Sequence, residues 1–275
     1  MLDQPRFAWG ERTAVMGVLN LTPDSFSDGG RLASVAQAVR AAGRMLAQGA
    51  DVLDLGAQST RPGAEEVGPE RELERLLPSL TAIRSAHPAA LLSIDTFHAA
   101  VAEAALAAGA DWINDVSGGR RDPAMLPLAA SAGCPLVLMH SRGDSRSMNS
   151  LACYGDVVAE VRAGLLAATE MALAAGVRPL QLIWDPGLGF AKDTDHNLDL
   201  LRGLGALVAE GFPLLVGPSR KRFIGAVLSE PRPRARLWGT AAVCSQAIAQ
   251  GARILRVHDV GPIVQVARMA DALLG

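Results

Sequence analysis

The sequence has 275 residues, and 49% of them are hydrophobic, so the chain can bury the large core of a globular protein. Its formal net charge of -2 excludes a strongly basic surface, and we expect no nucleic-acid and no membrane partner. No apolar run reaches about 18 residues and the N-terminus carries scattered charges, which argues against a membrane helix and a signal peptide. Cys134, Cys153 and Cys244 lack C-x-x-C spacing, which favours reduced cysteines in or near the core of a cytoplasmic protein.

Short apolar segments alternate with Ala/Leu-rich segments of helical character along the whole chain. The pattern predicts strands at residues 13–19, 51–55, 91–94, 111–115, 135–139, 180–184, 213–216 and 253–257. It predicts helices at 34–48, 70–86, 98–108, 123–132, 156–175, 195–204, 238–250 and 262–274. Near-continuous apolar strands between helices indicate a parallel sheet covered by helices. Eight such units favour an α/β fold, a single-domain (β/α)8 TIM barrel over residues 1–275, with an open doubly wound sheet as the alternative.

Polar side chains stand at the C-terminal end of every predicted strand, where barrel enzymes build their sites. They are Asn20, Gln58, Asp95, Asn114 with Asp115, His140, Asp185, Ser219 with Lys221, and His258. Any single Asp or Asn there is more often the N-cap of the next helix. Lysine and histidine are poor caps, so the set as a whole favours the barrel and an active site at this end.

Three of these segments carry specific chemistry. In IWDPGLGFAK, Asp185 precedes a Gly-rich turn, and its carboxylate can pair with a guanidinium-like edge of a ligand; a plain turn is the alternative. In LLVGPSRKRFIG, we expect Ser219 to cap a short helix that begins at Arg220 and to favour an anion there. In ILRVHDV, Arg256 and His258 lie two apart on a strand and can both face phosphate oxygens.

The segments NLTPDSFSDGG, QSTRPGA, SIDT, INDVSGG, LMH, WDPGLGFAK, SRKRFIG and RVHD resemble, in order and spacing, the motifs of the dihydropteroate synthase family. The resemblance runs from about Val15 to the C-terminus. It implies a transferase of folate biosynthesis that condenses 6-hydroxymethyl-7,8-dihydropterin diphosphate with 4-aminobenzoate, assisted by Mg2+, and releases 7,8-dihydropteroate and diphosphate. It also implies a homodimer that forms through the late helices.

The resemblance assigns roles to individual residues. Asp185 and Asn114 are expected to bind the amino-pyrimidinone edge of the pterin, Asp95 to lie near the ring nitrogens and the developing cation, and Lys221 to donate to the pterin carbonyl. Phe190 completes this pocket. The catalytic set is Asp95, Lys221, Arg256 and His258.

The remaining roles concern the diphosphate and the second substrate. Asn20, with the metal, is expected to clamp the diphosphate together with Arg256 and His258, and Ser219 to receive the aminobenzoate carboxylate. Two loops are expected to complete the second pocket: Phe26 and Asp28 from the first, and Ser59, Thr60, Arg61 and Pro62 from the second. Asp28 and Arg61 can pair when the first loop closes as a lid.

Some positions depart from the family pattern, and two alternatives stay open. The second loop reads GAQSTRPGA where many relatives have GGESTRPGA, so Gln58 lacks a charge. The loop after His140 matches only loosely, which leaves this histidine as a secondary candidate. Pterin-binding methyltransferases of the corrinoid type share the barrel, but are not expected to need the STRPG, SRK and RVHD motifs. A paralogue that binds pterin without condensing it is the other alternative.

Overall fold

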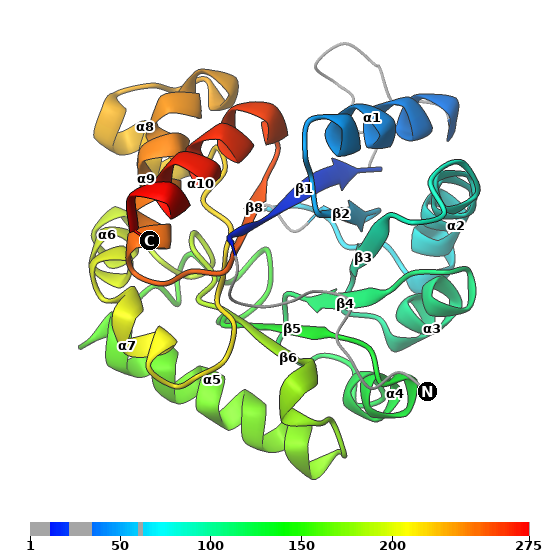
Figure 1. Ribbon diagram of the computed structural model, residues 1–275. Coiled ribbons are helices and arrows are strands. Elements are labelled where there is room, and N and C mark those ends of the chain that lie inside the picture. Colours follow the sequence, from blue (N-terminus) through cyan, green and yellow to red (C-terminus); the bar gives the residue numbers. More distant parts are fainter. Residues whose placement is uncertain (1–11, 22–34, 60–62, 275) are drawn as a thin grey trace.

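The computed structural model describes residues 12–21, 35–59 and 63–274 (Figure 1). The strands are β1 Ala14–Asn20, β2 Val52–Gly56, β3 Leu91–Asp95, β4 Trp112–Asp115, β5 Leu136–Met139, β6 Leu182–Asp185, β7 Leu215–Val216 and β8 Ile254–Val257. They form one parallel 8-stranded sheet in the order β6-β5-β4-β3-β2-β1-β8-β7. A parallel bridge between Trp184 and Leu214 joins the two ends of this order, so the sheet closes and the predicted barrel is confirmed.

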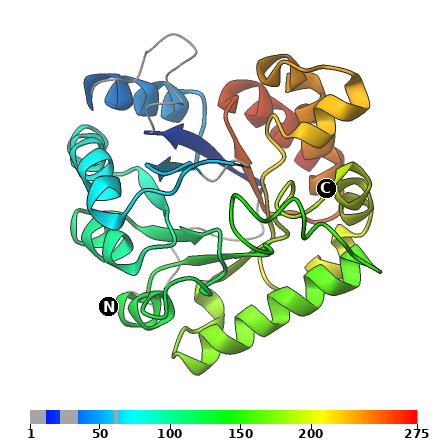
Figure 2. The same ribbon diagram turned by 180° about the vertical axis from the view of Figure 1, so that it is seen from behind.

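Helices surround the strands on all sides, as Figures 1 and 2 show from opposite directions. They are α1 Val35–Ala47, α2 Pro69–Ala86, α3 Ala99–Ala107, α4 Met125–Ala132, α5 Val157–Ala174, α6 Thr194–Arg202, α7 Leu204–Val208, α8 Arg222–Leu228, α9 Leu237–Ala249 and α10 Val260–Leu274, with 3₁₀ helices at Pro179–Gln181 and Pro233–Arg236. The helix predicted over 195–204 is α6, but it ends at Arg202, and Gly203 separates it from the short helix α7.

The interior of the barrel has an apolar floor. Alternate residues of each strand point inward, and one layer of them forms a dry cluster: Ala14, Met16, Val52, Trp112, Val137, Ile183, Leu215 and Ile254. The residues between them, such as Leu53 and Leu55, pack outward against the helices. Two positions further along the strands, most inward residues become polar or small, namely Asp54, Asn114, Asp185, Gly217 and Arg256, while Met139 stays apolar. The site is therefore built directly on the apolar floor.

Strand register aligns three of the predicted site residues at one level. Asn20 lies opposite Gly56, Gly56 opposite Asp95, and Asp95 opposite Asn114. A Cβ on residue 56 would lie 3.6 Å from Asp95 Oδ2 and 3.8 Å from Asn20 Oδ1. Gly56 therefore leaves open the space between the carboxylate and the amide.

Two further expectations can be compared with the described residues. Cys134 and Cys244 are buried, but Cys153 is exposed in the loop before α5, so the prediction of a core or near-core position is wrong for it. In the described part of the chain, no helix combines the length and apolar character needed to cross a membrane.

Candidate active site

A cavity of about 640 Å³ opens at the C-terminal ends of the strands, within the usual range for small-molecule sites. Predicted site residues line it: Asn20, Ser59, Asp95, Phe190, Ser219, Lys221, Arg256 and His258. A narrower recess shares Asp95, Phe190, Lys221 and Arg256 with this cavity, and is also lined by Asn114 and Asp185. The fold thus brings together residues from β1, β3, β4, β6 and β8 and from the loops after β2, β6, β7 and β8.

Arg256 lies among carboxylates inside the barrel. Its Nε donates to Asp54 Oδ2 at 2.6 Å, and its Nη2 donates to Asp95 Oδ2 at 2.6 Å. Burial opposes the charge of Arg256, but Asp54 and Asp95 raise its pKa above the ordinary value, so it stays a cation. Because Asp54 is fully buried and Arg256 is only 22% exposed, salt screens this pair less than a pair on the surface.

Burial shifts the ionisation of the carboxylates in the recess. It raises the pKa of Asp95 to about 7, against the lowering effect of Arg256, and Asp54 adds a further raising effect. Burial also raises the pKa of Asp185, although Gly187 N–H and Lys221 oppose the shift. Perturbed acids of this kind gather at functional sites.

Lys221 faces the recess from the loop after β7. Its Nζ lies 4.3 Å from the centre of the Phe190 ring, within cation–π range. Burial lowers the pKa of Lys221 to about 8, while Asp185 opposes that shift. A largely protonated amine at the edge of an aromatic wall can donate hydrogen bonds to a flat heterocycle.

Glycines shape the loop that carries Asp185 and Phe190. Asp185 Oδ1 accepts the N–H of Gly187 at 2.7 Å. Gly187 has φ +67°, and a Cβ there would lie only 1.9 Å from the carbonyl oxygen of His140. At Gly189, φ +75°, a Cβ would lie 3.1 Å from Lys221 Cδ. Glycine therefore allows this loop to pack closely against both the fifth strand end and Lys221.

Lys192, at the end of the same loop, stabilises the loop through three contacts of its amine. Its Nζ lies 3.1 Å from each of three acceptors, namely the carbonyls of Gly187 and Phe190 and Nδ1 of His140. Burial lowers the pKa of Lys192 to about 7 and that of His140 to about 3, so the imidazole is neutral and accepts through Nδ1. The secondary candidate His140 thus supports the loop.

Ser219 does not cap a helix, so that prediction is wrong. Arg220 takes the left-handed conformation, φ +61°, and helix α8 begins only at Arg222 with Lys221 as its N-cap. Ser219 Oγ instead accepts the backbone N–H of His258 at 3.2 Å and lies 2.9 Å from its Nδ1. The hydroxyl joins the loops after β7 and β8 and remains on the wall of the cavity.

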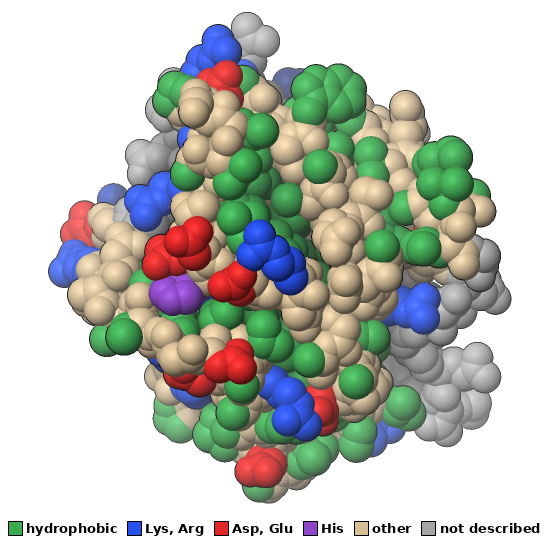
Figure 3. Space-filling view, turned by 90° about the vertical axis from the view of Figure 1, so that its left-hand side faces the viewer, with side chains coloured by type: hydrophobic (Ala, Val, Ile, Leu, Met, Phe, Trp, Pro, Cys, Tyr) green, Lys and Arg blue, Asp and Glu red, His purple; other side chains and the backbone are tan. Residues whose placement is uncertain are grey.

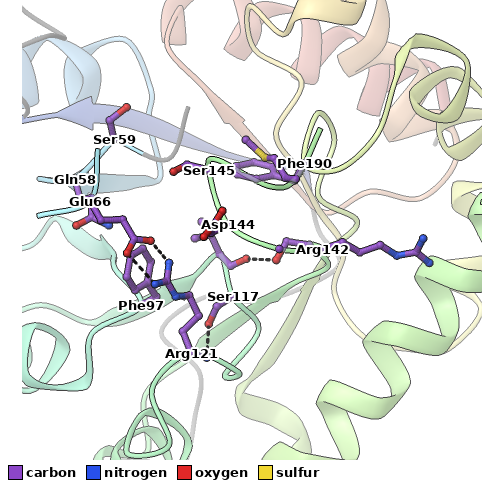
Figure 4. A pocket seen from close by; sticks show the side chains of 14 residues that line it. Gln58, Ser59, Glu66, Phe97, Ser117, Arg121, Arg142, Asp144, Ser145 and Phe190 are labelled. Carbon is purple, nitrogen blue, oxygen red and sulfur yellow. Dashed lines mark hydrogen bonds and ion pairs between the residues drawn. The ribbon is translucent and has the colours of Figure 1, made fainter. Parts of the chain in front are cut away.

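A second, smaller pocket adjoins the cavity on the side of β2 to β5 (Figure 4). An ion pair between Arg121 and Glu66 crosses it, and the Arg121 guanidinium lies 4.2 Å from the centre of the Phe97 ring. Ser145 Oγ donates to the carbonyl of Ala64 at 2.8 Å. These contacts attach the end of the second loop to its neighbours.

Several predicted residues lie outside the described part of the chain. They are Phe26, Asp28, Thr60, Arg61 and Pro62. The predicted lid and its Asp28–Arg61 pair are therefore not placed by the structure.

The sequence reasoning missed two residues, Asp54 and Lys192. Asp54 interrupts the apolar strand VLDLG two positions before its end, and an ionisable residue at an inward position of a buried strand is a usable signal. Lys192 ends the WDPGLGFAK segment, but nothing in the spacing shows that it turns inward. The sequence reasoning placed Asp115 among the polar strand-end residues, but its carboxylate accepts the N–H groups of Ser117 and Gly119 in its own turn.

The donor set suits a magnesium ion that arrives with a phosphate ligand. Among the residues that the structure describes, no three His, Cys, Asp or Glu side chains gather as a metal cluster. The amide oxygen of Asn20 faces the same gap as Asp95. Mg2+ commonly takes one or two protein oxygens and completes its shell with phosphate oxygens and water, so these residues fit it.

The chain matches a known protein family over most of its length. Residues 16–258 match the family described as pterin binding enzyme, and the chain belongs to that family.

Individual relatives narrow the class. The chain is 51% identical over 272 residues to the dihydropteroate synthase of Synechocystis sp., which covers 99% of this chain and 94% of the relative. The structure of Xanthomonas albilineans dihydropteroate synthase with 4-aminobenzoic acid has 42% identity and a TM-score of 0.90, covering 96% of this chain and 94% of the other. The same organism's enzyme in complex with 7,8-dihydropteroate has 40% identity and a TM-score of 0.86, covering 96% and 95%. Within the pterin binding enzymes, the chain falls among the dihydropteroate synthases.

Proposed function

We propose that the chain condenses 6-hydroxymethyl-7,8-dihydropterin diphosphate with 4-aminobenzoate in the cavity at the C-terminal end of the barrel. It is a transferase of folate biosynthesis. The observation that carries this conclusion is the recess lined by Asp95, Asn114, Asp185, Lys221 and Arg256, which combines buried acceptors with two cations. The identity of 51% to a dihydropteroate synthase over nearly the whole chain supports the same reaction and disfavours the corrinoid methyltransferases.

The recess binds the pterin. Asp185 has Oδ1 engaged by Gly187, which leaves Oδ2 to accept from the amino-pyrimidinone edge. Asn114 accepts beside it, and Lys221 donates to the pterin carbonyl. Phe190 forms an apolar wall beside these groups, which excludes water from the ring.

The rim binds the diphosphate and the second substrate. Arg256 and His258 clamp the diphosphate with Asn20, and Mg2+ bound there supplies positive charge that stabilises the leaving group. Ser219, whose hydroxyl contacts His258 on the cavity wall, receives the aminobenzoate carboxylate. Ser59 takes part with Thr60, Arg61, Pro62, Phe26 and Asp28 in closing over the benzene ring.

The residues act on charge that develops during the reaction. The bond from the pterin methylene carbon to oxygen breaks, and the diphosphate leaves with the electron pair. The amino nitrogen of 4-aminobenzoate bonds to that carbon and loses a proton. Ionised Asp95 stabilises the cationic pterin methylene, and Arg256 stabilises the departing anion, so both contribute more in the transition state than in the ground state.

The working unit is a cytoplasmic homodimer, and each subunit is a single pterin-binding barrel domain of residues 1–275. Helices α8 to α10 expose Val227, Leu228, Trp238 and Met269, and Trp238 is 78% exposed. Hydrophobic side chains gather in the middle and upper part of the face in Figure 3, and an exposed apolar patch favours self-association. The three free cysteines suit a reducing compartment.

Diphosphate release tests the reaction. The purified protein is mixed with both substrates and Mg2+, and release is followed over time against a mixture without 4-aminobenzoate. We expect release that depends on 4-aminobenzoate and stops when EDTA removes the metal. Release equal to the control would reject the synthase function and favour a protein that only binds pterin.

A further inference from the structure

Asp54 is a buried carboxylate at an unusual place. It points into the barrel from the middle of β2, one inward position above Val52 of the apolar floor, and its side chain has no exposed surface. Moving a carboxylate from water into such a place costs several kcal/mol unless charges and donors compensate. Its retention in the strand VLDLG therefore calls for a specific reason.

One oxygen of Asp54 joins two strands that are distant in sequence. Oδ2 accepts from Arg256 Nε, on β8, at 2.6 Å and from Asn114 Nδ2, on β4, at 3.1 Å. Arg256 and Asn114 both line the recess, whereas Asp54 does not line it. Asp54 thus contacts two residues of the site from beneath it.

These contacts fix the orientation of the Arg256 and Asn114 side chains. The guanidinium of Arg256 is a rigid planar fork, and with Nε on Asp54 and Nη2 on Asp95 its third nitrogen, Nη1, has a fixed direction. A carboxylate only accepts, so Asn114 must turn its NH2 group toward Asp54 and its carbonyl oxygen away from it. Asn114 then offers an acceptor, as Asp185 does, to the N–H groups of a bound ring.

We propose that Asp54 is a positioning residue of the active site: it aims the Arg256 guanidinium at the diphosphate and the Asn114 carbonyl at the pterin. The inference rests on the roles proposed above for these two partners. Asp54 acts through them and does not touch the substrate.

Asp54→Asn tests the proposal, because it keeps the shape but not the charge. The matched control is Ser93→Ala. Ser93 lies on β3 opposite Asp54 and is fully buried. Within the described part of the chain, its Oγ has no hydrogen-bond partner. We expect Asp54→Asn to lower kcat/KM for the pterin diphosphate about 100-fold, as misplacement by about 1 Å can do. Ser93→Ala should stay within about twofold, since it removes an unpaired group.

A further readout separates positioning from a merely structural role. In a double-mutant cycle, Asp54→Asn in an Arg256→Gln background should cost much less kcat/KM than in the wild-type background, because the partner is already lost. Independent, multiplying effects of the two substitutions would overturn the proposal.

The outcomes also distinguish this inference from the proposed function. If the wild type releases no diphosphate, the function itself fails; if the wild type and Asp54→Asn are equally active, only the positioning role fails. Should Asp54→Asn not fold, Arg256→Lys tests the same link, because a lysine keeps the charge but lacks the fork that contacts Asp54 and Asp95 together. Wild-type kcat/KM in Arg256→Lys would overturn the proposal, and a loss of about 100-fold would support it.

Discussion

Replacement of Asp185 by asparagine changes the pterin recess by one atom and one charge. Asp185 is buried, and its Oδ1 accepts the Gly187 N–H at 2.7 Å. The asparagine can keep that bond through its own oxygen, but it then presents an NH2 group where the wild type presents a carboxylate oxygen. A donor would face the N–H donors of the pterin edge.

The expected loss of affinity follows from these contacts. A hydrogen bond to a charged group contributes about 1.5 to 3 kcal/mol, and a buried donor left unpaired costs about 1 to 3 kcal/mol more. Together these effects weaken pterin binding by about 4 kcal/mol, or about a thousandfold in Kd. The fold should not weaken, because burial raises the pKa of Asp185 and thus disfavours the very charge that the substitution removes.

Isothermal calorimetry with a pterin that lacks the diphosphate measures this effect directly. The matched control is Asp199→Asn on the surface of α6, where the carboxylate contacts Arg202 at 2.6 Å and is 58% exposed. The control should bind pterin like the wild type, and thermal melts should show that both variants are folded. An unchanged Kd in Asp185→Asn would refute the assignment of the recess.

Three other predictions concern stability and assembly. Asp95→Asn should gain stability relative to the wild type by up to about 3 kcal/mol as the pH rises from about 5 to about 8. The reason is that folded Asp95 holds its proton up to about pH 7, well above its pKa in the unfolded chain, so the wild type loses stability as the pH rises toward 7. Thermal melts of both proteins across this pH range measure the effect. A stability difference that does not change with pH would contradict the prediction. Gly187→Ala should lower the free energy of unfolding in urea by more than about 2 kcal/mol, because its Cβ would meet the His140 carbonyl; Gly211→Ala, with φ +87° and no atom within 4 Å of the new Cβ, should cost clearly less. Trp238→Ser should shift the protein from dimer to monomer in light scattering, and an unchanged mass would argue against α9 as part of the interface.

Periodicity in the sequence was sufficient to predict the barrel. Near-continuous apolar strands such as Ala14–Asn20 need both faces covered, and a parallel sheet between helices meets that need. The ends of elements were predicted less well. Gly203 separates two helices at a point where a Cβ would lie 2.6 Å from Val158 of α5. Arg220 delays the start of α8, and its guanidinium is bound to Asp259 just before α10. Both are tertiary contacts.

Polar residues at the strand ends look alike in the sequence, but their side chains take different positions and make different contacts. Asp95 and Asn114 lie at one level of the recess, while neighbouring Asp115 points outward and only caps its own turn. Ser219 contacts His258 instead of capping a helix. One step along a strand reverses the side of a side chain, so the register decides which polar residue enters the site.

The sequence by itself determined the fold class, the end of the barrel that holds the chemistry and the residue types available there, because these follow from local periodicity and from motif order. The tertiary structure alone decided which of these groups touch one another. Asp54 and Arg256 are separated by 202 positions, and Lys192 and His140 by 52, yet each pair is in direct contact. Such contacts depend on strand order, register and burial, and burial is also what moves the pKa of Asp95 toward neutrality.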